Sequence, residues 1–168
     1  MKERKLLFWL TVAGLILLST LSMKYGILLY VGASLLGVMI SMHIFFLIGV
    51  LTKNHTFVDT AWGLSFIIVA HVSFWMQKEH SLLQWLVLAM VTIWGLRLFT
   101  HILTRTLGRA EDLRYQAVRK STEKQRSAVL ASYLRIYVLQ GFLALLIATP
   151  LILINALKPN DLSAWSPI

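Results

Sequence analysis

The chain has 168 residues, of which 58% are hydrophobic and 14% are charged, and it contains no cysteine. Soluble domains carry about 25% charged residues, so this composition, with a mean hydropathy of +0.73, excludes an ordinary soluble domain and favours a membrane protein. The lack of cysteine excludes disulfides and thiolate chemistry. The formal net charge of +9 comes with no nucleic-acid-binding motif, so we expect no nucleic-acid partner.

Five apolar stretches are long enough to cross, or nearly cross, a bilayer as helices, since a span needs about 20 apolar residues. The runs are continuous rather than alternating, which argues against strands. Ser-Thr-Leu-Ser-Met at 19–23 is a poor cleavage site, so the first stretch is expected to be a retained helix rather than a signal peptide. Pro150 predicts a kink or early exit in the last. The five spans are expected near 6–22, 27–51, 57–76, 82–104 and 129–156.

The distribution of Lys and Arg predicts the orientation. With the N-terminus in the cytoplasm, eleven of the sixteen basic residues lie on the cytoplasmic side and three lie outside, while Arg97 and Arg135 lie within spans. This is a clear positive-inside bias. We therefore predict an all-α, polytopic, single-domain membrane protein of about five spans, with a cytoplasmic N-terminus.

One long polar connection, 105–128, joins the last two spans. Its glycine, Gly108, follows the end of a helix, where a left-handed cap is common. The residues after it favour a helix, and Leu113, Ala117 and Val118 form a thin apolar stripe. We expect a basic helix on the cytoplasmic surface. Its charges fit a topology signal with attraction to anionic membrane lipids, or a site for a phosphorylated ligand.

Arg97, His101 and Arg105 are spaced by four residues, which places them on one helical face. A guanidinium facing lipid costs about 3 kcal/mol on insertion scales. We therefore expect Arg97 to face the bundle interior or a wet cavity with a partner, although snorkelling to the head groups is the alternative.

Asp59 begins the third predicted span, near the same membrane face. Thr56 and Asp59 match a capping box, which alone would explain the carboxylate. The alternative is an acid–base cluster with Arg97, His101 and Arg105, in which Trp62 lies one turn from Asp59 on the same face.

The other polar residues give weaker signals. His43 and His71 lie within spans, where a lone histidine is more often an interhelical hydrogen-bonding residue than a ligand. No spacing resembles a zinc site, and there is no Walker loop, GxGxxG or GxSxG motif. We expect no metal site.

Three motifs in order resemble those of a bacterial membrane family of unknown function in the steroid 5α-reductase superfamily. They read "NHTFVDTAWG" at 54–63, "WGLRLFTHILTR" at 94–105 and "GRAEDLRY" at 108–115. The resemblance spans about residues 50–157. It implies a multi-helix reductase of a bacterial cytoplasmic membrane that binds NADPH on the cytoplasmic side and reduces a C=C bond of a lipophilic substrate.

The resemblance also implies roles for individual residues. Asp59 and His101 become the catalytic candidates, and Trp62 and Arg97 become the substrate-pocket candidates. The cofactor-binding candidates are Arg105, Arg109, Glu111, Asp112, Arg114 and Tyr115. Ile102 stands where the steroid reductases have a tyrosine proton donor.

The resemblance covers the N-terminal two-thirds of the family pattern, because Lys158-Pro159-Asn160 is not the family's later cofactor motif. We therefore expect a reductase completed by a second polypeptide or a second copy of the chain. The alternative is a non-catalytic membrane protein: a remnant, or a lipid-binding or partner-binding subunit. A methyltransferase of related architecture is a third interpretation.

Overall fold

The computed structural model describes residues 26–122 and 128–157, and their regular elements are helices without a strand. The predicted all-α class is therefore confirmed. The first predicted span, 6–22, lies outside the described residues. The helices of the first described segment are α2 (Ile27–Thr52), α3 (Phe57–Trp75), α4 (Leu82–Thr106) and α5 (Leu113–Thr122). Those of the second are α6 (Ala128–Ser132), the π-helix η1 (Tyr133–Val138), α7 (Leu139–Ile147) and α8 (Thr149–Ala156).

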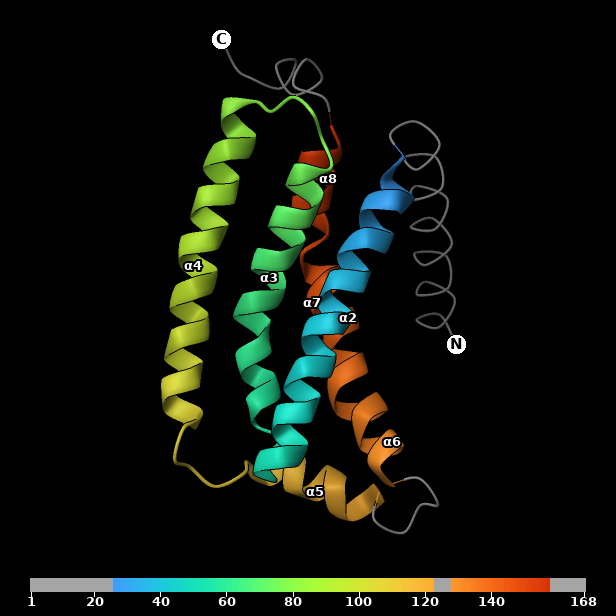
Figure 1. The fold of residues 1–168 in the computed structure, drawn as a ribbon, viewed down its shortest axis with the longest axis vertical. Coiled ribbons are helices and arrows are strands. Elements are labelled where there is room, and N and C mark those ends of the chain that lie inside the picture. The colour runs from blue at the N-terminus through green and yellow to red at the C-terminus, as the bar shows by residue number, and fades with distance from the viewer. Residues whose placement is uncertain (1–25, 123–127, 158–168) are drawn as a thin grey trace, which may run out of the picture.

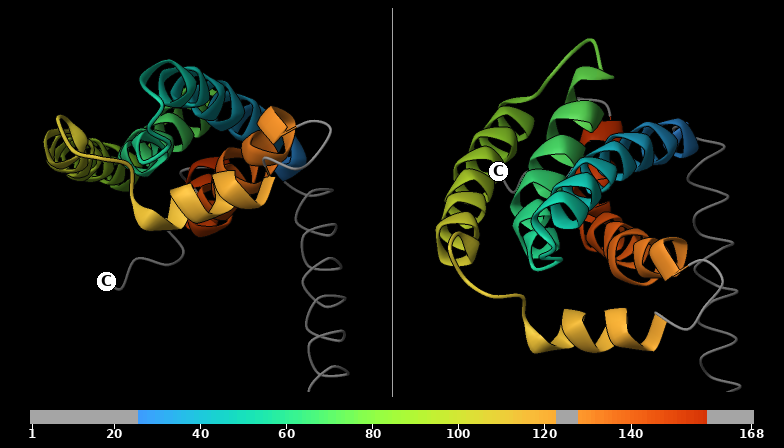
Figure 2. Two further views of the ribbon diagram at one scale, coloured as in Figure 1. Left: turned by 90° about the horizontal axis from the view of Figure 1, so that it is seen from below. Right: turned by 60° about the horizontal axis from the view of Figure 1, so that its bottom comes forward.

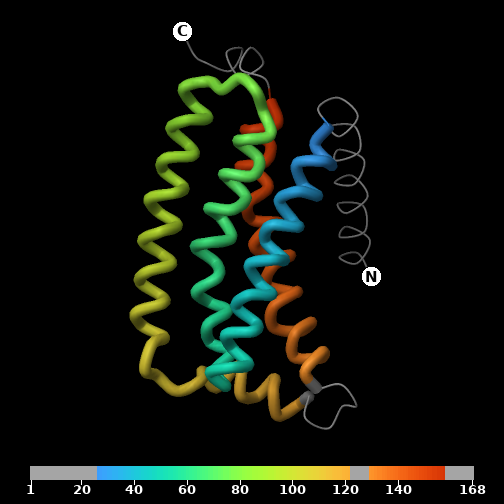
Figure 3. The backbone as a smooth tube through the Cα atoms, in the orientation of Figure 1, coloured from blue at the N-terminus to red at the C-terminus, as the bar shows by residue number. Residues whose placement is uncertain are grey.

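Helix α3 is the centre of the bundle (Figure 1) and packs against α2, α4, α7 and α8. In the span of α3, 61% of the residues are buried, against 11% in α4. Helix α4 is therefore an edge helix, whose main contact within the described residues is α3. The short connections between α2, α3 and α4 make neighbouring helices antiparallel, as the tube in Figure 3 shows.

In the described part of the chain, four segments are long and apolar enough to cross a membrane: Ile27–Thr52, Phe57–Trp75, Leu82–Thr106 and Val129–Ile147. The surfaces of α2 and α4 carry large exposed apolar side chains, among them Leu36, Ile40, Met90 and Ile93. Such a surface is what a lipid-facing bundle requires. The orientation of the bundle in the membrane stays a prediction.

Helix α5 crosses one end of the bundle rather than running along it (Figure 2). This is the end predicted to be cytoplasmic, and the predicted surface helix within 105–128 is present there. Gly108 follows the end of α4 with a φ of 72°, the left-handed conformation expected for it.

The last helical segment of the bundle, from α6 to α8, is interrupted next to Pro150, as the sequence predicted. Helix α7 ends at Ile147, and α8 begins at Thr149 with the proline in its first turn. A proline is tolerated there because the first N–H groups of a helix have no intrahelical partner. The π-helix η1, which precedes α7 in this segment, was not predicted.

Helices α3 and α4 touch through two glycines, each of which follows a tryptophan. A Cβ atom at Gly63 would lie 2.5 Å from the carbonyl oxygen of Gly95 and 2.7 Å from the amide nitrogen of Phe99. Small residues let helix backbones approach closely in membranes. His71 Nε2 and Thr92 Oγ1, 3.0 Å apart, add a hydrogen bond between the same helices, as expected for a lone membrane histidine.

Replacing Gly63 with alanine is expected to destabilise the protein by about 1–3 kcal/mol, because the new methyl group meets backbone rather than a movable side chain. The measurement is the free energy of unfolding of the purified protein in mixed micelles. Gly32→Ala is the matched control, since nothing lies within 4 Å of a Cβ at that position on α2. Equal effects of the two substitutions would contradict the close contact.

Candidate functional site

The carboxylate of Asp59 bonds to α5 rather than to its own helix. Asp59 lies in the first turn of α3, and its Oδ1 accepts a hydrogen bond from the Tyr115 hydroxyl. Its Oδ2 lies 3.5 Å from Nη2 of Arg114. The capping-box explanation for Asp59 is wrong, because Thr56 makes no side-chain cap bond to α3.

The residues before α3 hold the segment that leads into α5. Thr56 Oγ1 accepts a hydrogen bond of 2.8 Å from the backbone N–H of Asp112. Asn54 Nδ2 donates to the carbonyl oxygen of Arg109 over 3.0 Å. Polar side chains of the first sequence motif therefore bind the backbone of the third.

Glu111 adds a bond in the opposite direction, from a side chain of the third motif to the backbone of the first. Its Oε1 accepts a 3.0 Å hydrogen bond from the backbone N–H of His55, and its Oε2 lies 3.0 Å from Arg119 Nη2. The Glu111 side chain is only 5% exposed. The structure therefore buries the carboxylate of this cofactor-binding candidate beneath a partly exposed Arg119, rather than presenting it at an open surface.

His55 is a buried polar residue that the sequence reasoning missed. Its Nδ1 lies 2.9 Å from the hydroxyl oxygen of Tyr137. Burial lowers the pKa of the His55 imidazole below its ordinary value, and the nearby Glu111 carboxylate opposes this only in part. The folded protein therefore favours the neutral ring.

A hollow of about 420 Å³ is lined by Asp59 and is here called the Asp59 hollow. Three arginines and two carboxylates face it, so its lining is net basic. Arg114 donates to Asp112 from Nε over 3.1 Å and from Nη2 over 3.2 Å, which holds the pKa of that carboxyl below its usual range. The lining residues are Thr56, Asp59, Trp62, Ile102, Arg105, Thr106, Arg109, Ala110, Asp112 and Arg114.

Tyr115 does not line the Asp59 hollow, and the residue is only 6% exposed. Burial, followed by its hydrogen bond to Asp59, raises the pKa of the Tyr115 phenol above its ordinary value. Tyr115 therefore keeps its proton at neutral pH. Gln140, another residue missed from the sequence, donates to the Tyr115 oxygen over 3.0 Å.

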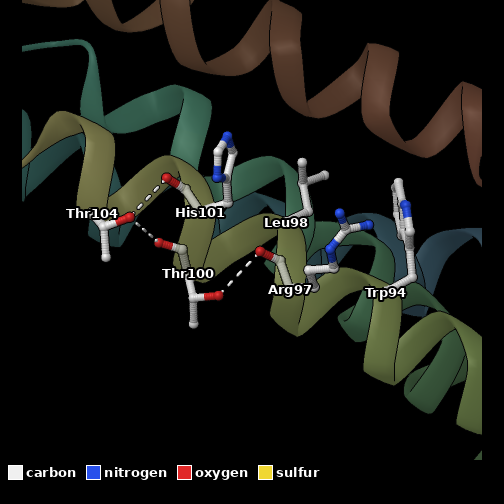
Figure 4. A pocket seen from close by; sticks show the side chains of 6 residues that line it. All are labelled: Trp94, Arg97, Leu98, Thr100, His101 and Thr104. Carbon is white, nitrogen blue, oxygen red and sulfur yellow. Dashed lines mark hydrogen bonds between the residues drawn. The ribbon is translucent and has the colours of Figure 1, made fainter.

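Arg97 and His101 lie elsewhere. They line a second hollow of about 450 Å³, the flank hollow, together with Trp94, Leu98, Thr100 and Thr104. Figure 4 shows Trp94, Arg97, Leu98 and His101 pointing to one side of α4. Both basic side chains are exposed.

The expectation that Arg97 faces a partner inside the bundle is therefore wrong for the described residues, among which its side chain makes no hydrogen bond or ion pair. The physical reason is helical phase. Gly95 and Thr106 are buried on the face of α4 that packs on α3, and Arg97 lies two residues, or about 200°, from Gly95. The structure brings Arg105 to Asp59, but not Arg97 or His101.

Acid is expected to destabilise the protein through His55. Between the lowered folded pKa and the ordinary value of 6.5, the unfolded chain binds more protons, so stability falls as pH falls through this window. Thermal unfolding between about pH 7.5 and 5.5 tests this. His55→Gln should flatten the dependence, whereas His43→Gln, at an exposed site, should not. An unchanged slope in His55→Gln would contradict the assignment.

Asn54→Ala is expected to loosen the segment 109–112, because it removes the bond to the Arg109 carbonyl. Tryptic cleavage after Arg109, followed by mass spectrometry, should become several-fold faster, since proteolysis tracks the open population. Thr52→Ala is the control, because the Thr52 hydroxyl donates to the carbonyl oxygen of Ile48 in its own helix, α2. Identical cleavage in the two variants would show that Asn54 does not hold this segment.

Residues 45–168, which are 124 of the 168 residues, match the model of a family described as "Protein of unknown function (DUF1295)". The matched region contains every residue of the Asp59 hollow. No curated protein and no solved structure matches the chain. The chain is a member of the DUF1295 family.

Proposed function

We propose that this chain is a membrane-embedded, steroid 5α-reductase-like protein that uses NADPH to reduce a C=C bond of a lipophilic substrate. The observation that carries the proposal is the Asp59 hollow, where a phenol–carboxylate pair adjoins three arginines at the end predicted to be cytoplasmic. All three motifs of the resemblance contribute to it, and the family match covers them.

The lining of the Asp59 hollow suits the phosphates of a dinucleotide. Arg105, Arg109 and Arg114 all line this one space, and guanidinium groups pair with phosphate oxygens in a bidentate manner. Ligand sites usually measure about 300–1,000 Å³, so 420 Å³ suits part of such a cofactor. When bound, NADPH supplies a hydride.

The chain's own residues would hold the substrate and a proton. Tyr115 carries its proton at Oη and presents it to Asp59, while Arg114 balances the carboxylate charge. Ile102 lines the hollow and offers no proton. The proton would instead pass from Tyr115 through Asp59, which lines this space, to the substrate carbon left carbanionic by hydride transfer, and water would then return a proton to Tyr115. A positioned acid contributes about 10²–10⁴-fold to a rate.

An aromatic wall supports a lipophilic substrate. The ring of Trp62, which lines the Asp59 hollow, lies 6.2 Å from that of Phe66, and Phe66 lies 5.4 Å from Trp94. This row leads from the Asp59 hollow toward the flank hollow, which Trp94 lines. The row offers apolar contact along the span.

A non-catalytic membrane protein is the second candidate. Both oxygens of Asp59 accept bonds from α5, so the cluster would also serve as a structural lock. In that case the basic hollow would bind anionic lipid or a partner.

Titration of the purified full chain with NADPH, followed by cofactor fluorescence, tests the proposal. Arg109→Ala and Arg114→Ala should each raise Kd about 10–100-fold, which corresponds to about 1.5–3 kcal/mol for a charge-assisted hydrogen bond. Arg97→Ala is the matched control, because Arg97 lies in the flank hollow, and it should bind as the wild type does.

Two results would contradict the proposal. One is no binding at millimolar NADPH, with or without a candidate second polypeptide. The other is an equal loss in Arg97→Ala and Arg109→Ala, which would indicate general electrostatic attraction rather than a site. Binding of anionic vesicles in place of NADPH would favour the second candidate.

A further inference from the structure

The side-chain amide of Gln140 joins Trp62, which lines the Asp59 hollow, to Tyr115, which is not part of the lining. On one side, Gln140 Oε1 lies 2.6 Å from the indole Nε1 of Trp62. On the other side, Gln140 Nε2 lies 3.0 Å from the Tyr115 hydroxyl oxygen. With the bond from Tyr115 to Asp59, four side chains from α3, α5 and α7 form one continuous chain of hydrogen bonds.

The polarity of this chain follows from the chemistry of its members. An indole N–H can only donate, so the atom of Gln140 that faces Trp62 must be the carbonyl oxygen. The amide NH₂ then faces Tyr115 and donates to its oxygen. Because Tyr115 has a single proton, that proton is left for Asp59.

We propose that Gln140 is a positioning residue: held by Trp62, its amide directs the single hydroxyl proton of Tyr115 onto Asp59. The proposal rests on the proposed function only in that Asp59 and Tyr115 are the acid–base pair there. Gln140 touches neither the Asp59 hollow nor any expected ligand, since it is absent from the lining. It acts through Tyr115.

Few charged groups compete for this proton within the described residues. From α3, Asp59 faces the phenol, and from α5, the Arg114 guanidinium carbon lies 5.4 Å from the Tyr115 ring centroid. Arg105 of α4 and Asp112 line the hollow beyond Asp59. The neutral amide of Gln140 is the hydrogen-bond partner on the side of α7. Its orientation therefore decides where the proton points.

The test is the ionisation of position 115 in the full chain, with a fluorinated tyrosine incorporated there to make the phenol more acidic and to give a ¹⁹F signal. Gln140→Met keeps the length of the side chain but removes the N–H donor. A donor to the phenolate favours ionisation, so its loss should raise the titration midpoint by about one unit, a tenfold fall in the ionisation constant. Gln140→Glu, which places an acceptor there, should raise it further.

Gln77→Met is the matched control, because Gln77 also loses an N–H bond, to the carbonyl oxygen of Ala156 at the far end of the bundle. It should leave the midpoint unchanged. An unchanged midpoint in Gln140→Met would overturn the positioning role, and a lowered midpoint would show that the amide accepts from Tyr115. Neither NADPH nor substrate is needed, so this result is independent of whether the reductase proposal holds.

Discussion

The hydrogen bond from Tyr115 to Asp59 is the contact on which this end of the bundle depends. It ties the crossing helix α5 to the central helix α3, and Gln140 extends the tie to α7. Since α5 covers the end of the bundle (Figure 1), this tie also fixes where Arg114 and Asp112 stand. Asn54, Thr56 and His55 hold the segment before α5, and the Tyr115–Asp59 bond attaches the helix itself to α3.

Two further constraints make that contact possible. The close contact between Gly63 and Gly95 brings the end of α4 next to the start of α3. Arg105 therefore lines the Asp59 hollow. The side chains of Asn54 and Thr56 bind the backbone of 109–112, which delivers the start of α5 at the right place. Some polar groups of the motifs therefore build the site by binding the backbone of 109–112, and others by lining the Asp59 hollow.

Sequence reasoning reached the helical class, the bounds of α2, α3 and α4 to within two residues, and the break at Pro150, because these follow from local apolar runs and from proline chemistry. It also placed Asp59 near Arg105, because consecutive antiparallel spans bring the start of one beside the end of the next. It missed Gln140, His55 and the π-helix, whose roles depend on contacts between distant segments. It misjudged Arg97, because the packed face of α4 is set by Gly95 rather than by charge.

A double-mutant cycle between Asp59→Ala and Tyr115→Phe tests the central contact most directly. The free energy of unfolding is measured for the wild type, both single variants and the double variant. A hydrogen bond to a charged group predicts a coupling energy of about 1.5–3 kcal/mol. Effects that add to within about 0.5 kcal/mol would show that the two residues act independently, and the account of this end of the bundle would be wrong.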